Sequence, residues 1–139
     1  MTDRELINLA LEAMEKAYAP YSGFGVGAAL ECSDGSVFLG CNVENAAYGE
    51  TICAERTALV NAVSEGRRSF RRMAVAARSE QFCMPCGSCR QVLSEFSPDM
   101  EILAVRADGR YVSYRLGDLL PKSFGPSTMG EKPGESIEG

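Results

Sequence analysis

The sequence predicts a single α/β domain built on a mixed sheet, with helices and strands in the order αββαβαββα. Three observations support this prediction. Segments with strand patterns alternate with segments of helical periodicity, and two Asp-Gly pairs lie between strand patterns as hairpin turns. The 139 residues, 45% of them hydrophobic, suffice for one core. The sheet should begin with an antiparallel hairpin and continue through strand-helix-strand units.

The first expected element is a helix that starts at Thr2. Thr2 can cap the helix, and Glu5, three residues further on, completes a capping box. Ala19 should end the helix, because the residue before a proline such as Pro20 avoids helical backbone angles. The apolar side follows the spacing of one buried helical face and contains Leu6, Leu9, Ala10, Ala13, Met14 and Ala17.

The remaining elements follow from the same patterns. A turn at Asp34-Gly35 should join two strands, and Asp108-Gly109 should join two more. In chain order we expect strands over 24–32 and 37–43, a helix over 52–64, a strand over 73–77, a helix over 87–96, strands over 102–106 and 111–115, and a short helix over 116–120.

Composition limits the classes of partner. The net charge of -5 and the pI near 4.8 argue against a long nucleic-acid duplex, whose binding depends on neutralising phosphates. No apolar run approaches the length of a membrane span, and the first residues do not resemble a secretory signal, so we expect a cytoplasmic protein. Arg67, Arg68, Arg71 and Arg72 form a local basic cluster, which we interpret as a solvated connection, with an RNA-facing patch as the alternative.

The content of histidine and cysteine narrows the chemistry. The chain has no histidine, which excludes Ser-His and Cys-His nucleophiles and any imidazole-bound metal. It has six cysteines, and in a reducing compartment their close spacing favours a metal site over disulfides. They are Cys32, Cys41, Cys53, Cys83, Cys86 and Cys89.

One pair of cysteines lies at the expected start of a helix. Pro85 is followed by Cys86 and Cys89 in a C-x-x-C pattern, where helix N–H groups can offset thiolate charge. The pair alone fits a metal site, a redox dithiol or two inert thiols. Cys53, at the start of another expected helix, favours the metal site, since three thiolates can hold zinc and leave a fourth position for water. Glu55 can then move a proton without being a ligand.

The pattern C-x-E followed by P-C-x-x-C resembles the signature of zinc-dependent deaminases, with cysteine in place of the usual histidine. More specifically, the chain resembles small homotetrameric cytidine deaminases. The resemblance covers nearly all residues before 125, in the family's order. The matching stretches are YAPYSGFGVGAAL (18–30), GCNVENAAYG (40–49), CAERTAL (53–59), PCGSCRQV (85–92) and LLPKSF (119–124).

This resemblance implies a three-layer α-β-α sandwich with a mixed sheet. It also implies hydrolytic deamination of cytidine and 2′-deoxycytidine to uridine and 2′-deoxyuridine, with release of ammonia, in pyrimidine salvage. One zinc ion per chain would be held by Cys53, Cys86 and Cys89, zinc-bound hydroxide would attack C4 of the base, and Glu55 would shuttle protons. We expect one catalytic domain over 1–125 and a disordered tail over 126–139.

The resemblance also assigns substrate contacts. Asn42 and Glu44 match residues that hold the ribose 3′-hydroxyl, and the Ala54 backbone N–H matches a contact to the pyrimidine carbonyl. Aromatic contacts are assigned to Phe24, Tyr48 and Phe124, with Phe124 reaching in from a neighbouring subunit of a homotetramer.

The hairpin register decides whether Phe24 can share a face with those polar residues. A two-residue turn at Asp34-Gly35 pairs Phe24 with Asn45, which puts Phe24 on the face opposite Asn42. A three-residue turn or a bulge would restore a shared face. The sequence leaves both registers open.

Two further residues bear on the metal. Three thiolates give a zinc site a negative formal charge, and we expect Arg56 to offset it through hydrogen bonds to one or two sulfurs. Cys83, which is not part of the family pattern, keeps open a closed four-cysteine structural or electron-carrying site.

Other deaminases are closer alternatives. A blasticidin-type enzyme should lack the segment NVENAAY, and a nucleic-acid-editing enzyme should show a basic groove with aromatic residues. The chain has the segment NVENAAY, and it is acidic with 8% aromatic residues and no tryptophan. The sequence therefore favours a free nucleoside as the substrate.

Overall fold

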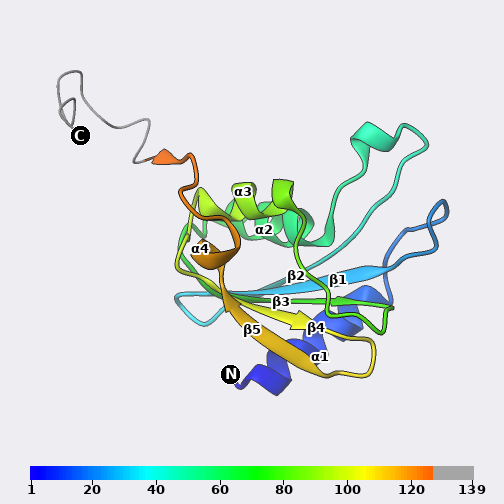
Figure 1. The fold of residues 1–139 in the computed structure, drawn as a ribbon, viewed down its shortest axis with the longest axis horizontal. Helices are drawn as coiled ribbons and strands as arrows, with labels where there is room; N and C mark the ends of the chain where they lie inside the picture. Colours follow the sequence, from blue (N-terminus) through cyan, green and yellow to red (C-terminus); the bar gives the residue numbers. More distant parts are fainter. Residues whose placement is uncertain (127–139) are drawn as a thin grey trace.

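The computed structural model describes residues 1–126 and shows a five-stranded sheet with helices on both faces (Figure 1). The predicted three-layer architecture and element order are confirmed, with a short 3-10 helix, η1, in addition. The elements are α1 (Asp3–Met14), β1 (Val26–Cys32), β2 (Val37–Cys41), η1 (Tyr48–Glu50), α2 (Ala54–Ser64), β3 (Phe70–Ala77), α3 (Gly87–Ser94), β4 (Glu101–Val105), β5 (Tyr111–Arg115) and α4 (Leu116–Leu119).

Some boundaries differ from the sequence-based expectation. Helix α1 ends at Met14, several residues before the proline that we expected to end it. Helix α2 begins at Ala54, so Cys53 precedes the helix as its N-cap residue. The expected tail over 126–139 lies, from residue 127 on, outside the described residues.

The sheet has the strand order β2-β1-β3-β4-β5. Strands β3 and β4 are parallel and connected through α3, whereas every other neighbouring pair is antiparallel. Val26 at the start of β1 pairs with Ala77 at the end of β3, and Gly27 pairs with Cys41 at the end of β2. One edge of the sheet therefore gathers the start of β1 and the ends of β2 and β3, and the segments that leave this edge build the site.

The two faces of the sheet carry separate apolar cores. Helix α1 packs on one face, and α2, α3 and α4 lie on the other (Figure 1). Close approach is possible because glycines face both helices. A Cβ atom on Gly27 would lie 2.2 Å from the carbonyl oxygen of Ala10, and one on Gly40 would lie 2.4 Å from the backbone nitrogen of Ala58. The predicted capping box of Thr2 and Glu5 is present at the start of α1.

The β1–β2 hairpin turns through three residues, so the two-residue register is wrong. The backbone N–H of Cys32 donates to the carbonyl of Ser36 at 2.8 Å, and Gly35 adopts a φ of 89° that favours glycine. Asp34 stabilises this turn, because its carboxylate accepts from the Ser36 backbone N–H at 3.0 Å. The regular pairing stops at Gly27 and Cys41, and beyond it Val43 bridges to Tyr18 and Ile52. Phe24 and Asn42 nevertheless line the same cavity, as the three-residue turn allows.

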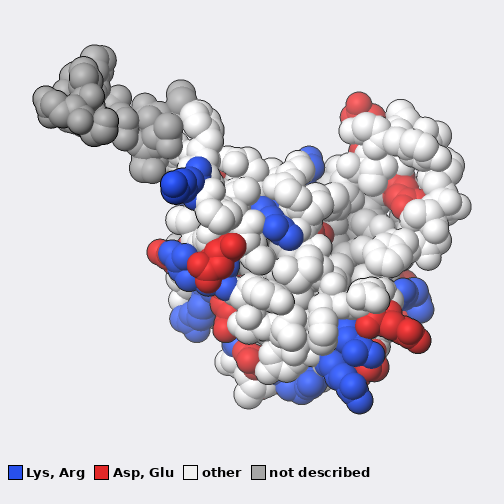
Figure 2. Space-filling model, in the orientation of Figure 1, with Lys and Arg blue, Asp and Glu red and all other residues white. Residues whose placement is uncertain are grey.

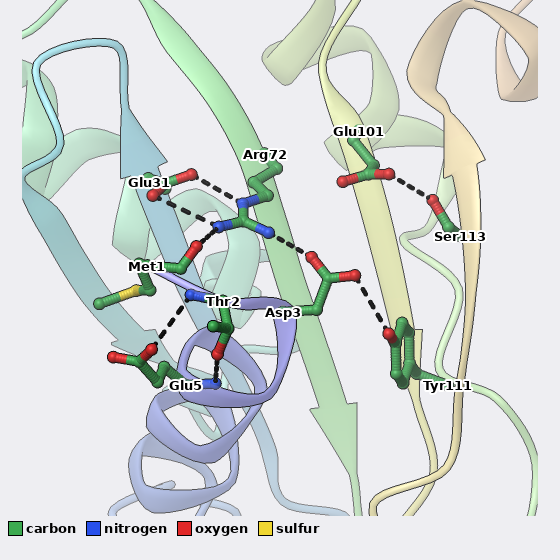
Figure 3. Close-up of polar contacts among 9 residues, drawn as sticks. All are labelled: Met1, Thr2, Asp3, Glu5, Glu31, Arg72, Glu101, Tyr111 and Ser113. Carbon is green, nitrogen blue, oxygen red and sulfur yellow. Dashed lines mark hydrogen bonds and ion pairs between the residues drawn. The ribbon is translucent and has the colours of Figure 1, made fainter.

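A partly buried ion cluster joins the N-terminus to the sheet (Figure 3). Arg72 donates from Nε to Glu31 at 2.7 Å, and its other nitrogens bond Asp3 and the Met1 carbonyl. Glu31 is only 1% exposed, and the Tyr111 hydroxyl donates to the second oxygen of Asp3 at 3.0 Å. Arg72 therefore compensates a buried carboxylate on the face that α1 covers.

The other arginines of the basic cluster also bond within the chain. Arg67 pairs with Asp34 at 3.0 Å, Arg68 donates to the Val63 carbonyl at 2.9 Å, and Arg71 donates to the Ser33 carbonyl at 3.2 Å. Because β3 begins at Phe70, the expectation of a solvated connection holds only for the first two residues of the cluster. In residues 1–126 we find no helix with the length and apolar character needed to cross a membrane.

Candidate active site

Three cysteine sulfurs meet where α2 and α3 begin. Cys53 and Cys86 are the N-cap residues of these helices, and Cys89 lies in the first turn of α3. All three Sγ atoms lie within 4.8 Å of one another, and those of Cys86 and Cys89 are 3.3 Å apart. The backbone N–H of Cys89 also donates to the Cys86 sulfur at 3.4 Å. The predicted grouping of these three thiols is thus present.

This donor set fits zinc. With Zn–S bonds of about 2.3 Å, tetrahedral thiolates lie about 3.8 Å apart, a separation that small side-chain adjustments provide here. Burial opposes ionisation of Cys86, yet hydrogen bonds from the Cys89 N–H and the neighbouring thiols lower the pKa of Cys86. Burial raises the pKa of Cys53 and Cys89. Three protein ligands leave a fourth position for water, which is the arrangement of a catalytic zinc site.

Cys83 stays outside this group. Its sulfur is not among the clustered ligand atoms of the described residues, although its side chain lines the same cavity as Glu55. Burial, with a smaller effect of the Glu55 charge, raises the pKa of Cys83 to about 12. The closed four-cysteine site therefore has no support in the geometry.

Glu55 is the second residue of α2 and is only 5% exposed. Burial raises the pKa of its carboxyl group, and nearby backbone N–H groups, the Cys89 thiol and Arg56 counteract part of that effect. A buried carboxyl group with a raised pKa beside a metal site can both accept and return a proton. This is the property that proton transfer requires.

A cavity of about 220 Å³ lies in front of the cysteines and Glu55. Figure 2 shows the surface hollowed between the body of the molecule and the lobe that contains η1. The lining residues come from the segments before β1, between β2 and α2, and between β3 and α3, together with the start of β1 and the first turn of α2. They are Phe24, Val26, Asn42, Thr51, Cys53, Ala54, Glu55, Cys83, Met84 and Cys86. Six of these ten residues were suggested from the sequence as substrate contacts, zinc ligands or the proton-transfer group: Phe24, Asn42, Cys53, Ala54, Glu55 and Cys86. Cys83 was considered as a further ligand, and the other three were not suggested.

Asn42 lies between the cavity and the start of β1. Its Oδ1 accepts from the Val26 N–H at 2.8 Å, and its Nδ2 donates to the Phe24 carbonyl at 2.8 Å. The side chain thus extends the β1–β2 pairing past the last regular pair and fixes the backbone that carries Phe24. Its assignment to the ribose stays a prediction.

Glu44 lies beside an adjoining cavity, which is lined by Tyr21, Ser22, Glu44, Tyr48 and Thr51. The carboxylate accepts from the backbone N–H groups of Tyr21 at 3.0 Å and Ser22 at 3.1 Å, and from the Ser22 hydroxyl. These hydrogen bonds lower the pKa of Glu44, and those from Ser22 have the largest effect. Thr51 lines both cavities, which are therefore neighbours.

The aromatic residues around the cavities are strongly exposed. Phe24 is 44% exposed, Tyr48 is 76% exposed and stacks edge-on with Tyr21 at 6.2 Å, and Phe124 is 59% exposed. Phe124 lines neither of the two cavities of its own chain, and its carbonyl accepts from Gln91 at 2.7 Å. The expected contact of Phe124 is with the site of a neighbouring subunit, and it stays a prediction.

Arg56 differs from the expectation in its contacts. Its Nη2 donates to Ser88 Oγ at 2.9 Å, and within residues 1–126 it donates to no cysteine sulfur. The Nε atom is buried and has no hydrogen-bond partner among the described residues. Arg56 lies three residues after Cys53, at the start of the same helix, so an unpartnered donor there is compatible with a negatively charged metal site.

Sequence reasoning missed Val26, Thr51, Met84 and Ser88. Thr51 and Met84 lie two residues before Cys53 and Cys86, so an extended backbone before each helix could have indicated that they share a side with the ligands. Val26 required the correct hairpin register. Ser88 lies between two ligands, but its partner on another helix gave no signal in the sequence.

The comparisons with known proteins agree with this geometry. Residues 1–105 match the family model described as the cytidine and deoxycytidylate deaminase zinc-binding region, and the chain belongs to this family. A curated relative, cytidine deaminase of Halalkalibacterium halodurans, is 47% identical over 131 residues, which cover 93% of this chain and 99% of the relative. A cytidine deaminase of Mycobacterium tuberculosis is 45% identical over 116 residues, or 84% of each chain.

Solved structures show the same likeness. The crystal structure of cytidine deaminase from Burkholderia pseudomallei matches with a TM-score of 0.87 and 50% identity, covering 89% of this chain and all (100%) of that one. The Mycobacterium tuberculosis enzyme matches with a TM-score of 0.78 and 41% identity, covering 90% of this chain and 99% of the other.

Proposed function

We propose that this chain is a zinc-dependent cytidine deaminase, which hydrolyses cytidine and 2′-deoxycytidine to uridine and 2′-deoxyuridine with release of ammonia. The observation that carries the proposal is the buried Glu55 beside three clustered cysteine thiols at the floor of an open cavity. The family and the relatives' names support the same substrate. The reaction belongs to pyrimidine salvage, and we place it in the cytoplasm.

Cys53, Cys86 and Cys89 would hold the zinc ion. When bound there, zinc lowers the pKa of a coordinated water and so supplies a nucleophile near neutral pH. Glu55 would accept one proton of the attacking water and donate it to ring N3 as the C4–O bond forms. It would then take the remaining proton from the new C4 hydroxyl and deliver it to the amino group, whose bond to C4 breaks. One water is consumed and one ammonia is released for each uridine formed.

The remaining residues bind and orient the nucleoside. Ala54 is the first residue of α2, so its N–H is free of helical hydrogen bonds and can donate to the pyrimidine carbonyl. Asn42 and Glu44 retain acceptor capacity for the sugar hydroxyl groups beyond the bonds that anchor them. Phe24 and Tyr48 supply apolar area at the rim.

The charge of the two cavities supports an unphosphorylated substrate. Neither cavity is lined by a lysine or arginine, whereas Glu44 and Glu55 line one each. A 5′-phosphate would meet carboxylates and no cationic partner, and binding a phosphate without one is unfavourable.

We further propose that residues 1–125 form one catalytic domain and that four chains assemble with shared active sites. The exposed Phe124 and Tyr48, and the open rim next to Cys86, support an assembly in which a neighbouring chain covers the cavity. A large exposed aromatic rim is the kind of surface that a subunit contact buries.

A direct test incubates the zinc-loaded protein with cytidine, 2′-deoxycytidine and cytidine 5′-monophosphate in parallel. The proposal expects equimolar uridine product and ammonia from the two nucleosides and little or none from the nucleotide. Turnover of the nucleotide at the rate of the nucleosides would contradict the assigned substrate class, and no turnover of any of them would contradict the function.

A further inference from the structure

We infer that Ser88 is a positioning residue, which holds Arg56 so that the free donors of its guanidinium face the cysteine thiolates. The inference rests on the proposed zinc site and adds a residue of this chain to it. Ser88 is the second residue of α3 and lies between Cys86 and Cys89 in sequence. Its Oγ accepts from Arg56 Nη2 at 2.9 Å.

This contact connects the two halves of the metal site. Arg56 lies in the first turn of α2, which follows Cys53, and Ser88 lies in the first turn of α3, which carries the other two thiols. It joins the first turn of α2 directly to the first turn of α3. The relative placement of the three sulfurs therefore depends on this bond as well as on apolar packing.

The hydrogen bond to Ser88 also restricts the orientation of the Arg56 guanidinium. A guanidinium is planar and rigid, so fixing one nitrogen limits where the other N–H groups point. Arg56 Nε is buried without a partner in the described residues. Three thiolates and Zn²⁺ carry a net negative charge, so a guanidinium held beside them stabilises the ionised ligands and withdraws charge from the metal.

Ser88 does not act on the substrate itself. It is exposed and does not line either cavity of the site. Loss of its hydroxyl should thus weaken zinc retention and lower kcat while KM stays the same. A role in substrate binding would instead change KM.

The test compares Ser88→Ala, Ser88→Thr, Arg56→Ala and the Ser88→Ala/Arg56→Ala double variant, all prepared with zinc. Transfer of zinc to a chromophoric chelator is followed for each, with kcat, KM and thermal unfolding measured alongside. We expect Ser88→Ala to lose zinc affinity by about tenfold, the lower end for partners of metal ligands. Ser88→Thr should retain the wild-type affinity, because it keeps the hydroxyl group. In the Arg56→Ala background, removing Ser88 should add nothing.

Wild-type zinc retention in Ser88→Ala would overturn the inference, and so would equal zinc loss in Ser88→Ala and Ser88→Thr. It would also be overturned if Ser88→Ala lowered zinc affinity in the Arg56→Ala background as much as it does in the wild type. Zinc transfer needs no substrate, so it tests the role of Ser88 even if the wild-type protein fails to deaminate cytidine. The two proposals can therefore fail separately.

Discussion

Asn42 shows how one side chain serves both the fold and the site. Its amide group bonds two backbone groups of β1, the Val26 N–H and the Phe24 carbonyl, and its side chain also lines the cavity. Buried or half-buried backbone groups need such partners where a regular strand pairing stops. The position of Phe24 at the rim therefore depends on Asn42.

We predict that Asn42→Ala lowers the free energy of unfolding by about 1–3 kcal/mol, because two backbone groups lose their partners. The KM for cytidine should rise as well, since Phe24 loses its support. Urea denaturation and steady-state kinetics measure the two effects. Asn61→Ala is a matched control, because Asn61 makes one long, exposed bond of 3.4 Å to Leu39, and it should change the free energy by less than about 0.5 kcal/mol. Equal effects of the two substitutions would contradict this account of Asn42.

At the scale of residues, patterns with local causes could be predicted from the sequence. The capping box of Thr2 and Glu5 lies within one turn, and the ligand spacing of Cys86 and Cys89 within another. The Arg56 contact could not be predicted, since it depends on how α2 and α3 lie beside each other. The partner of Arg72 could not be predicted either, because Glu31 is far away in sequence.

At the scale of elements, the site depends on two helix N-termini held at one edge of the sheet. Helix α2 reaches its place because Gly40 on β2 leaves room for its backbone, and α1 approaches the other face over Gly27. The sequence predicted the helices and strands well, because each has a strong periodicity or turn signal. It did not settle the hairpin register, because Asp34-Gly35 fits a two-residue and a three-residue turn equally well.

The two glycines provide a matched pair of variants. A Cβ at either position would meet helix backbone at 2.2–2.4 Å, so Gly40→Ala and Gly27→Ala should each destabilise the fold by about 1–3 kcal/mol. We predict that only Gly40→Ala also weakens zinc binding, because it displaces α2 and with it Cys53, whereas α1 carries no site residue. Thermal unfolding and chelator competition measure the two effects. Equal zinc affinity in both variants would show that the position of α2 does not control the site.

At the scale of the whole molecule, the isolated chain leaves its cavity open. The rim aromatics are exposed, and Phe124 lines neither cavity of its own chain. The proposed assembly follows from the family resemblance and agrees with this exposure. A single sequence could not show it, because the contact lies between copies of the chain.

Complementation tests whether Phe124 acts across subunits. Glu55→Gln should be inactive, and Phe124→Ala should raise KM by about tenfold or more, because the substrate would lose the aromatic contact that the proposed assembly supplies. If Phe124 acts on a neighbour, refolding the two variants together restores sites that combine an intact Glu55 with an intact Phe124. We predict activity at low substrate well above the sum of the separate variants. Activity no higher than that sum, or a fully active monomer in size-exclusion chromatography, would contradict the shared site.

The central claim is that Glu55 transfers protons beside a metal held by three thiolates. The most direct measurement follows the loss of cytidine absorbance with wild-type protein and with Glu55→Gln at equal zinc content. The account predicts rapid loss with the wild type and a rate roughly 10²–10⁴-fold lower with the variant, the usual contribution of a positioned acid–base group. Equal rates at equal zinc content would contradict the role of Glu55, and no loss with either protein would contradict the proposed function.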